Sequence, residues 1–143
     1  MDLRRLSETY MISAQLAPGD MAGLAAEGVQ LVICNRPDAE NPSDLQASAM
    51  QQAADTAGIG FVYNPVNGAA MTMDNVEEQA AALDAADGPV AAYCGSGMRS
   101  AVMWAFAQAG RIDTDTIIAA GDAAGVSLSG MRAQIDAMAA RGD

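Results

Sequence analysis

Cys94 is the residue of this chain whose surroundings best fit a chemical role. A short apolar strand, residues 90–93, ends at this cysteine, a loop with Gly95 and Gly97 follows, and Arg99 opens an alanine-rich helix. Such a turn points backbone N–H groups at one spot, where the helix dipole and an arginine add positive charge. We expect Cys94 to exist there largely as the nucleophilic thiolate, so the segment predicts a reactive cysteine in an anion-binding loop.

The alternative is that Cys94 is a buried core residue, because cysteine is among the most often buried residue types. The neighbouring residues favour the functional interpretation, since two glycines permit a tight loop and an arginine follows at the start of a helix. The predicted anion-binding loop consists of Gly95, Ser96, Gly97 and Met98.

Composition narrows the possible partners and chemistry. The 143 residues fit one domain, which we expect to span residues 1–143 with a core at about 6–134 and a frayed tail. A net charge of −11 disfavours nucleic acid and anionic membrane as partners. Two cysteines and no histidine exclude a disulfide framework, a Cys–His pair and a Ser–His–Asp triad, and we expect no metal and no cofactor.

No apolar run approaches the roughly 18 residues of a membrane span, and the first residues lack the apolar stretch of a secretory signal. A cytoplasmic location is therefore expected, and the oligomeric state is left open.

The order of elements predicts an α/β protein with a parallel sheet flanked by helices and a helical C-terminus. The expected strands span residues 10–16, 29–34, 61–63 and 90–93, and the first of them is expected at an edge of the sheet. The expected helices are 18–27, 45–56, 72–84, the segment from Arg99 to about 110, 113–124 and 127–138.

Ligands of parallel sheets gather at the carboxyl ends of the strands, where loops from several strands meet. Arg36 and Asp38 follow one expected strand and Asn67 follows another, so these three residues are candidates for the pocket. The alternatives are an ion pair of Arg36 with Asp38 that braces the turn, and a simple turn at Asn67. Cys34 is a candidate resolving thiol for Cys94, with a core role as its alternative.

Three segments carry a resemblance to a known family. They are Val32-Ile33-Cys34-Asn35-Arg36-Pro37-Asp38, Asn64-Pro65-Val66-Asn67-Gly68 and Tyr93-Cys94-Gly95-Ser96-Gly97-Met98-Arg99-Ser100. In this order they resemble the bacterial phosphatase-like domain that is fused to some beta-lactamase-like hydrolases and is labelled either phosphatase or sulfurtransferase. The resemblance covers residues 6–134 and implies a fold like that of dual-specificity protein tyrosine phosphatases. It also implies that Cys94 is the nucleophile, Arg99 the anion-holding arginine and Ser100 a hydroxyl near the thiolate.

The chain departs from the pattern of cysteine-dependent phosphatases at specific positions. Four residues separate Cys94 from Arg99, whereas those phosphatases have five. Their aspartic acid, which protonates the leaving alkoxide, comes from a loop that here offers Asn67. Gly95 stands where members of the resembled family often carry a basic residue.

These departures favour sulfur transfer, because four intervening residues is the loop size of rhodanese-type sulfurtransferases and a sulfite or thiolate leaving group needs no general acid. In this hypothesis Cys94 carries a persulfide from a small anionic or persulfide donor to a thiol acceptor. The alternative is a tyrosine-type phosphatase that works through a cysteinyl-phosphate, and a third possibility is an idle module that binds an anion or a partner.

Overall fold

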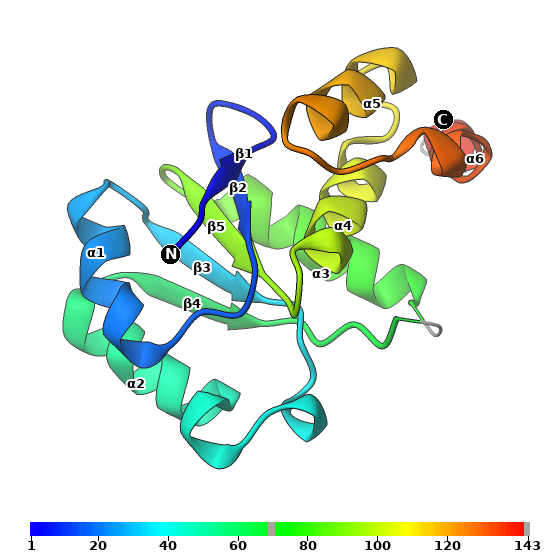
Figure 1. Cartoon of the computed structure of the whole chain (residues 1–143). Helices are drawn as coiled ribbons and strands as arrows, with labels where there is room; N and C mark the ends of the chain where they lie inside the picture. The colour runs from blue at the N-terminus through cyan, green and yellow to red at the C-terminus, as the bar shows by residue number, and fades with distance from the viewer. Residues whose placement is uncertain (69–70, 142–143) are drawn as a thin grey trace.

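Strand pairing places Cys94 next to the middle of a sheet. The computed structural model describes residues 1–68 and 71–141, and within them five strands form one sheet in the order β1-β2-β5-β3-β4 (Figure 1). The strands are β1 (Arg4–Arg5), β2 (Tyr10–Ser13), β3 (Leu31–Cys34), β4 (Gly60–Tyr63) and β5 (Val90–Tyr93). Only β1 runs antiparallel to its neighbour among these strands, and the other pairs are parallel. The α/β fold with a mostly parallel sheet is thus confirmed.

Helices cover both faces of the sheet (Figure 1). One face packs against α1 (Met21–Ala26) and α2 (Ala47–Ala57). The other face packs against α3 (Met73–Ala85) and α4 (Met98–Gln108), and α5 (Thr114–Ala123) and α6 (Arg132–Arg141) pack against α4. Short 3-10 turns occupy Pro18–Asp20, Asp38–Glu40, Ser43–Leu45 and Ser129–Met131.

The central helix of the second face is α4, which begins directly after the cysteine loop. Its residues from Ser100 to Ala107 are all buried, so it is apolar around its whole circumference, as expected of a helix enclosed by other elements. Trp104 of α4 packs on Tyr10 of β2 with the ring centroids 6.2 Å apart. This packing fixes the helix whose N-terminus faces Cys94.

Several expectations about the elements are wrong, including the strand expected at 10–16, which ends at Ser13, and the helix expected from 127, which begins at Arg132. Strand β2 is internal rather than at an edge, because the two-residue strand β1, too short to give a sequence signal, pairs with it. Helix α2 begins at Ala47 rather than Leu45, because Gln46 is extended with φ −74° and ψ 165°. Helix α6 continues to Arg141, past the start of the expected frayed tail, and residues 142–143 lie outside the described residues.

No helix in the described part of the chain is both long and apolar enough to cross a membrane.

Candidate active site

The loop after β5 holds the Cys94 sulfur against the start of α4. The backbone N–H of Gly97 donates to Cys94 Sγ at 3.0 Å, and both residues are buried. Gly97 is the residue that precedes α4 and has φ +99°, a conformation that L side chains rarely adopt. The loop thereby directs an amide and the positive end of the helix dipole at the Cys94 sulfur.

The second strand and Arg4 hold the loop from outside. Cys94 N–H donates to the Ser13 carbonyl oxygen at 3.4 Å, at the end of β2. Arg4 Nη2 donates to the Ser96 carbonyl oxygen at 3.0 Å, and its Nη1 donates to the Ala124 carbonyl oxygen at 3.1 Å. A Cβ on Gly97 would lie only 2.7 Å from Arg4 Nη2, so a larger residue here would displace the end of the Arg4 side chain. Arg4 thus ties the loop to the end of α5.

Arg99 lies over the loop and is held by the two neighbouring loops. Its Nη1 donates to the Val66 carbonyl oxygen at 2.8 Å and to Glu40 Oε2 at 3.0 Å, while Nη2 donates to Glu40 Oε1 at 2.8 Å. The Glu40 carboxylate, and to a smaller extent the Cys94 thiol, raise the pKa of Arg99 above its usual range. The same ion pair lowers the pKa of Glu40. Arg99 is therefore charged, and its guanidinium is bonded to the Glu40 carboxylate and the Val66 carbonyl oxygen.

Arg36 is brought to the same place by the turn after β3. A Cβ atom added to Gly95 would lie 3.5 Å from Arg99 Nη2 and 3.9 Å from Arg36 Cζ, so both guanidinium groups border this glycine. Arg36 Nε donates to Glu40 Oε1 at 3.3 Å. Both arginines consequently share one carboxylate above the cysteine loop.

The expected ion pair of Arg36 with Asp38 is wrong, since Glu40 is the acidic partner of Arg36. Asp38 braces the connection between β3 and α2 in another way. Its Oδ1 accepts from the Ala47 N–H at 2.8 Å, and its own N–H donates to the Tyr63 hydroxyl at 2.8 Å. The Asp38 carboxylate is therefore committed to the start of α2 rather than to the pocket.

Ser100 belongs to a buried polar network beneath the loop. Its Oγ donates to Asn35 Oδ1 at 2.9 Å, and its carbonyl oxygen accepts from the Tyr10 hydroxyl at 2.8 Å. Gln79 Oε1 accepts from the amide groups of Asn35 and Asn64 at 3.0 and 2.9 Å. The resemblance implied that the Ser100 hydroxyl lies near the thiolate, whereas its described hydrogen bond goes to Asn35. The network fixes α4 relative to the ends of β3 and β4.

Cys34 packs with Tyr93 on the face of the sheet that α1 and α2 cover. Its Sγ donates to the Arg36 carbonyl oxygen at 3.3 Å, and burial raises the pKa of this thiol. Both cysteines are free thiols, and a resolving role for Cys34 stays a prediction.

The two remaining candidate site residues, Asn67 and Met98, lie at the surface around the cysteine loop. Asn67 is exposed on the loop after β4, where the group that reaches the site is the carbonyl of Val66. Met98 is 45% exposed at the start of α4. Together with Arg4 and Ser96 it lines a cavity of about 250 Å³ beside the cysteine loop.

The sequence reasoning missed Glu40, Gln79 and Arg4. Glu40 follows Arg36 by four residues, a spacing typical of an ion pair that could have been noticed. Gln79 and Arg4 carry no comparable local signal, because their partners lie far away in the sequence.

We predict that Arg4→Ala lowers the free energy of unfolding by about 1–2 kcal/mol, because two carbonyl oxygens lose a charged donor. Chemical denaturation of the variant measures this loss. Arg5→Ala is the matched control, because the exposed Arg5 bonds only to the nearby Glu8 carbonyl oxygen in the described structure. Equal stability of both variants would contradict a bracing role for Arg4.

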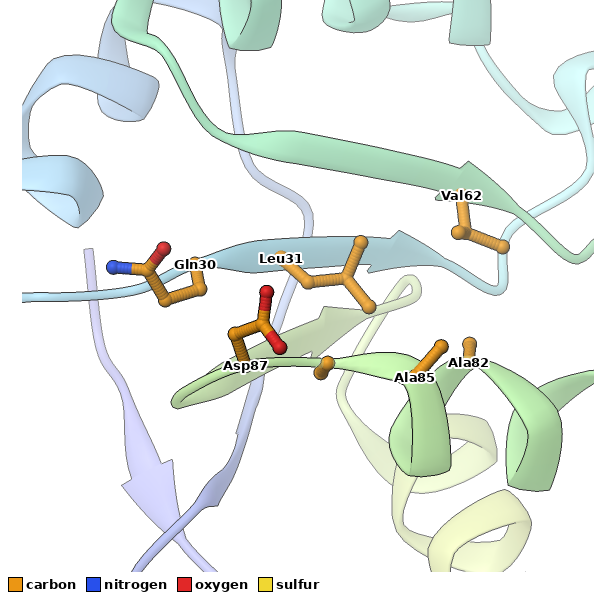
Figure 2. Close-up of a pocket in the computed structure, with 7 residues that line it drawn as sticks. Gln30, Leu31, Val62, Ala82, Ala85 and Asp87 are labelled. Carbon is orange, nitrogen blue, oxygen red and sulfur yellow. The ribbon is translucent and has the colours of Figure 1, made fainter.

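A different cavity, of about 250 Å³, lies where β3 begins (Figure 2). It is lined by Gln30, Leu31, Val62, Ala82, Ala85, Ala86 and Asp87. None of these described residues is a predicted site residue, and Cys94 follows the opposite end of its strand. Among the residues that the structure describes, no three Cys, Asp or Glu side chains gather in a way that could hold a metal ion.

Comparison with known proteins gives consistent matches. Residues 2–111 match the family model described as the phosphatase-like domain of beta-lactamase hydrolase-like protein. The chain is 30% identical over 130 residues to the beta-lactamase hydrolase-like protein of Xylella fastidiosa (strain Temecula1 / ATCC 700964), a match that covers 90% of this chain and 30% of that protein. The chain thus spans less than a third of the length of the curated relatives it matches.

Among solved structures, a phosphatase candidate from Neisseria meningitidis is 34% identical, with a TM-score of 0.82 and coverage of 96% of this chain and 99% of that one. PTPMT1, solved in complex with PI(5)P, is 19% identical, with a TM-score of 0.72 and 99% coverage of both chains, a likeness that shows the fold alone. The neighbours confirm the expected tyrosine phosphatase-like fold, whereas the expected sulfur transfer is not confirmed.

Proposed function

The chain belongs to the family of the phosphatase-like domain of beta-lactamase hydrolase-like proteins, and from this premise we propose that it is a cysteine-dependent phosphatase acting on small phosphoesters. The proposal rests chiefly on one contact: the buried Cys94 sulfur accepts the Gly97 N–H at 3.0 Å, in a loop whose Gly95 is bordered by Arg99. A thiolate, loop amides and a guanidinium in one place suit a phosphoryl group.

The proposed reaction begins when the Cys94 thiolate attacks phosphorus. A sulfur–phosphorus bond forms, and the bond to the leaving oxygen breaks with its electron pair on that oxygen. The phosphoryl oxygens carry negative charge throughout, so the amides at the start of α4 and the Arg99 fork stabilise them. Water then releases inorganic phosphate from the cysteinyl-phosphate and restores the thiolate.

The structure supports preorganisation of this loop. Backbone contacts from β2, the side chain of Arg4 and the Ser100 network fix the loop from three sides. Donors that are already fixed need no rearrangement as the transition state forms. This preorganisation is the main source of electrostatic catalysis. Met98 and Arg4 border the cavity beside the loop, where the organic part of a phosphoester could lie.

Sulfur transfer remains the second candidate, and one observation favours it. Four residues separate Cys94 from Arg99, a spacing that suits a single terminal sulfur better than a phosphoryl group with three oxygens. The same thiolate would carry the persulfide, and the Gly97 amide would donate to it.

Parallel assays distinguish the two functions. The purified chain is incubated with para-nitrophenyl phosphate and phenyl phosphate, and separately with thiosulfate and cyanide. Release of inorganic phosphate that depends on Cys94, without thiocyanate formation, supports the phosphatase. Thiocyanate together with a mass gain of one sulfur on the protein, and no phosphate release, would overturn it in favour of sulfur transfer.

A further inference from the structure

A phosphatase needs a proton for its leaving group, because alkoxides and most phenolates leave poorly as anions. Asn67 in the loop after β4 cannot supply one, and the Asp38 carboxylate accepts the Ala47 N–H at the start of α2. The carboxylate that contacts the catalytic arginine is Glu40, with oxygen–nitrogen distances of 2.8 and 3.0 Å to Arg99.

From this geometry we propose, on the basis of the proposed phosphatase function, that Glu40 is the general acid and base of the reaction. It comes from the 3-10 turn Asp38–Glu40 after β3, and not from the loop after β4. Arg36 and Arg99 hold its carboxylate from two sides, above the loop that carries Cys94. Its side chain is 37% exposed, so it can exchange protons with water.

The proton and electron movements balance across the two steps. In the first step the protonated Glu40 carboxyl gives its proton to the leaving oxygen, which receives the electron pair of the broken bond to phosphorus. An alcohol leaves, and Glu40 becomes a carboxylate. In the second step this carboxylate takes a proton from water, the water oxygen attacks phosphorus, and the sulfur–phosphorus bond returns its electron pair to Cys94.

Substrate binding changes the charge balance around Glu40. In the ligand-free protein the two arginines stabilise the carboxylate and lower its pKa. A phosphoryl dianion on Arg99 would compete for that guanidinium and add negative charge nearby, and both effects favour the protonated carboxyl. The charged side chains bonded to Glu40 in the described structure are those of Arg36 and Arg99, and the Tyr63 hydroxyl is a further titratable group near it, so the bound anion is the main new charge.

The test compares Glu40→Gln with the wild-type chain on substrates that differ in leaving group. With para-nitrophenyl phosphate, whose phenolate leaves readily, kcat/KM should fall by no more than about threefold. With phenyl phosphate or an alkyl phosphate it should fall about 100-fold or more, and the decline of the rate at high pH, where the acid loses its proton, should disappear. Glu40→Asp, which keeps a carboxyl group, should restore part of the rate on the poor leaving groups.

Asp44→Asn is the matched control, because Asp44 is an exposed carboxylate in the same connection between β3 and α2. This variant should have the kcat/KM of the wild-type chain on all of the substrates. If Glu40→Gln lowered kcat/KM by the same factor for every substrate, Glu40 would only position Arg99. If the variant bound every substrate more tightly by the same factor, Glu40 would only compete with substrates for Arg99. Either result overturns the proposal while the phosphatase function stands. A wild-type chain without any phosphatase activity would overturn both.

Discussion

Cys94→Ser is expected to lower kcat/KM for aryl phosphates by at least about 10³-fold, because a serine hydroxyl without a base is a poor nucleophile at neutral pH. The chain has no histidine that could activate the serine. Apart from the Gly97 N–H, which donates to the sulfur, the loop and Arg99 are held by Ser13, Arg4 and Glu40, so we expect them to keep their positions in the variant. The variant should therefore still bind phosphate.

Two measurements check this result. Phosphate release gives the loss of turnover, and isothermal titration with inorganic phosphate or tungstate gives the affinity of the loop for anions. Retained turnover in the variant would exclude Cys94 as the nucleophile. An inactive wild-type chain that binds phosphate as tightly as its variant does would support an anion-binding module in place of an enzyme.

Asn35→Ala is expected to reduce the free energy of unfolding by about 3 kcal/mol, the largest effect on stability among the changes considered. Asn35 is fully buried and bonds to Ser100, Gln79 and the Asn64 carbonyl oxygen. Its removal leaves buried partners unpaired, and each such group costs about 1–3 kcal/mol. The loss also loosens the contact between the end of β3 and the start of α4.

Urea denaturation followed by circular dichroism measures the change. Asn67→Ala is the control, because Asn67 is exposed and its removal should change stability by less than about 0.5 kcal/mol. If the two variants lost similar amounts, the buried network would not be a major source of stability.

The local pattern around Cys94 determined the central part of the site. Gly97 and the apolar residues of β5 and α4 are close in the sequence, so their backbone preferences alone indicate a strand, a tight loop and a helix. The alternation of apolar segments with helix signals likewise determined the α/β class and the parallel pairing of β3, β4 and β5.

The tertiary structure decided which side chains complete the site. Glu40 lies 59 residues from Arg99 and Arg4 lies 92 residues from Ser96, so their contacts depend on strand order and on loop conformation. The two-residue strand β1 that places Arg4 is too short to show periodicity. Local sequence preferences fix the backbone near each residue, whereas ion pairs and buried hydrogen bonds between distant segments form only when packing brings the segments together.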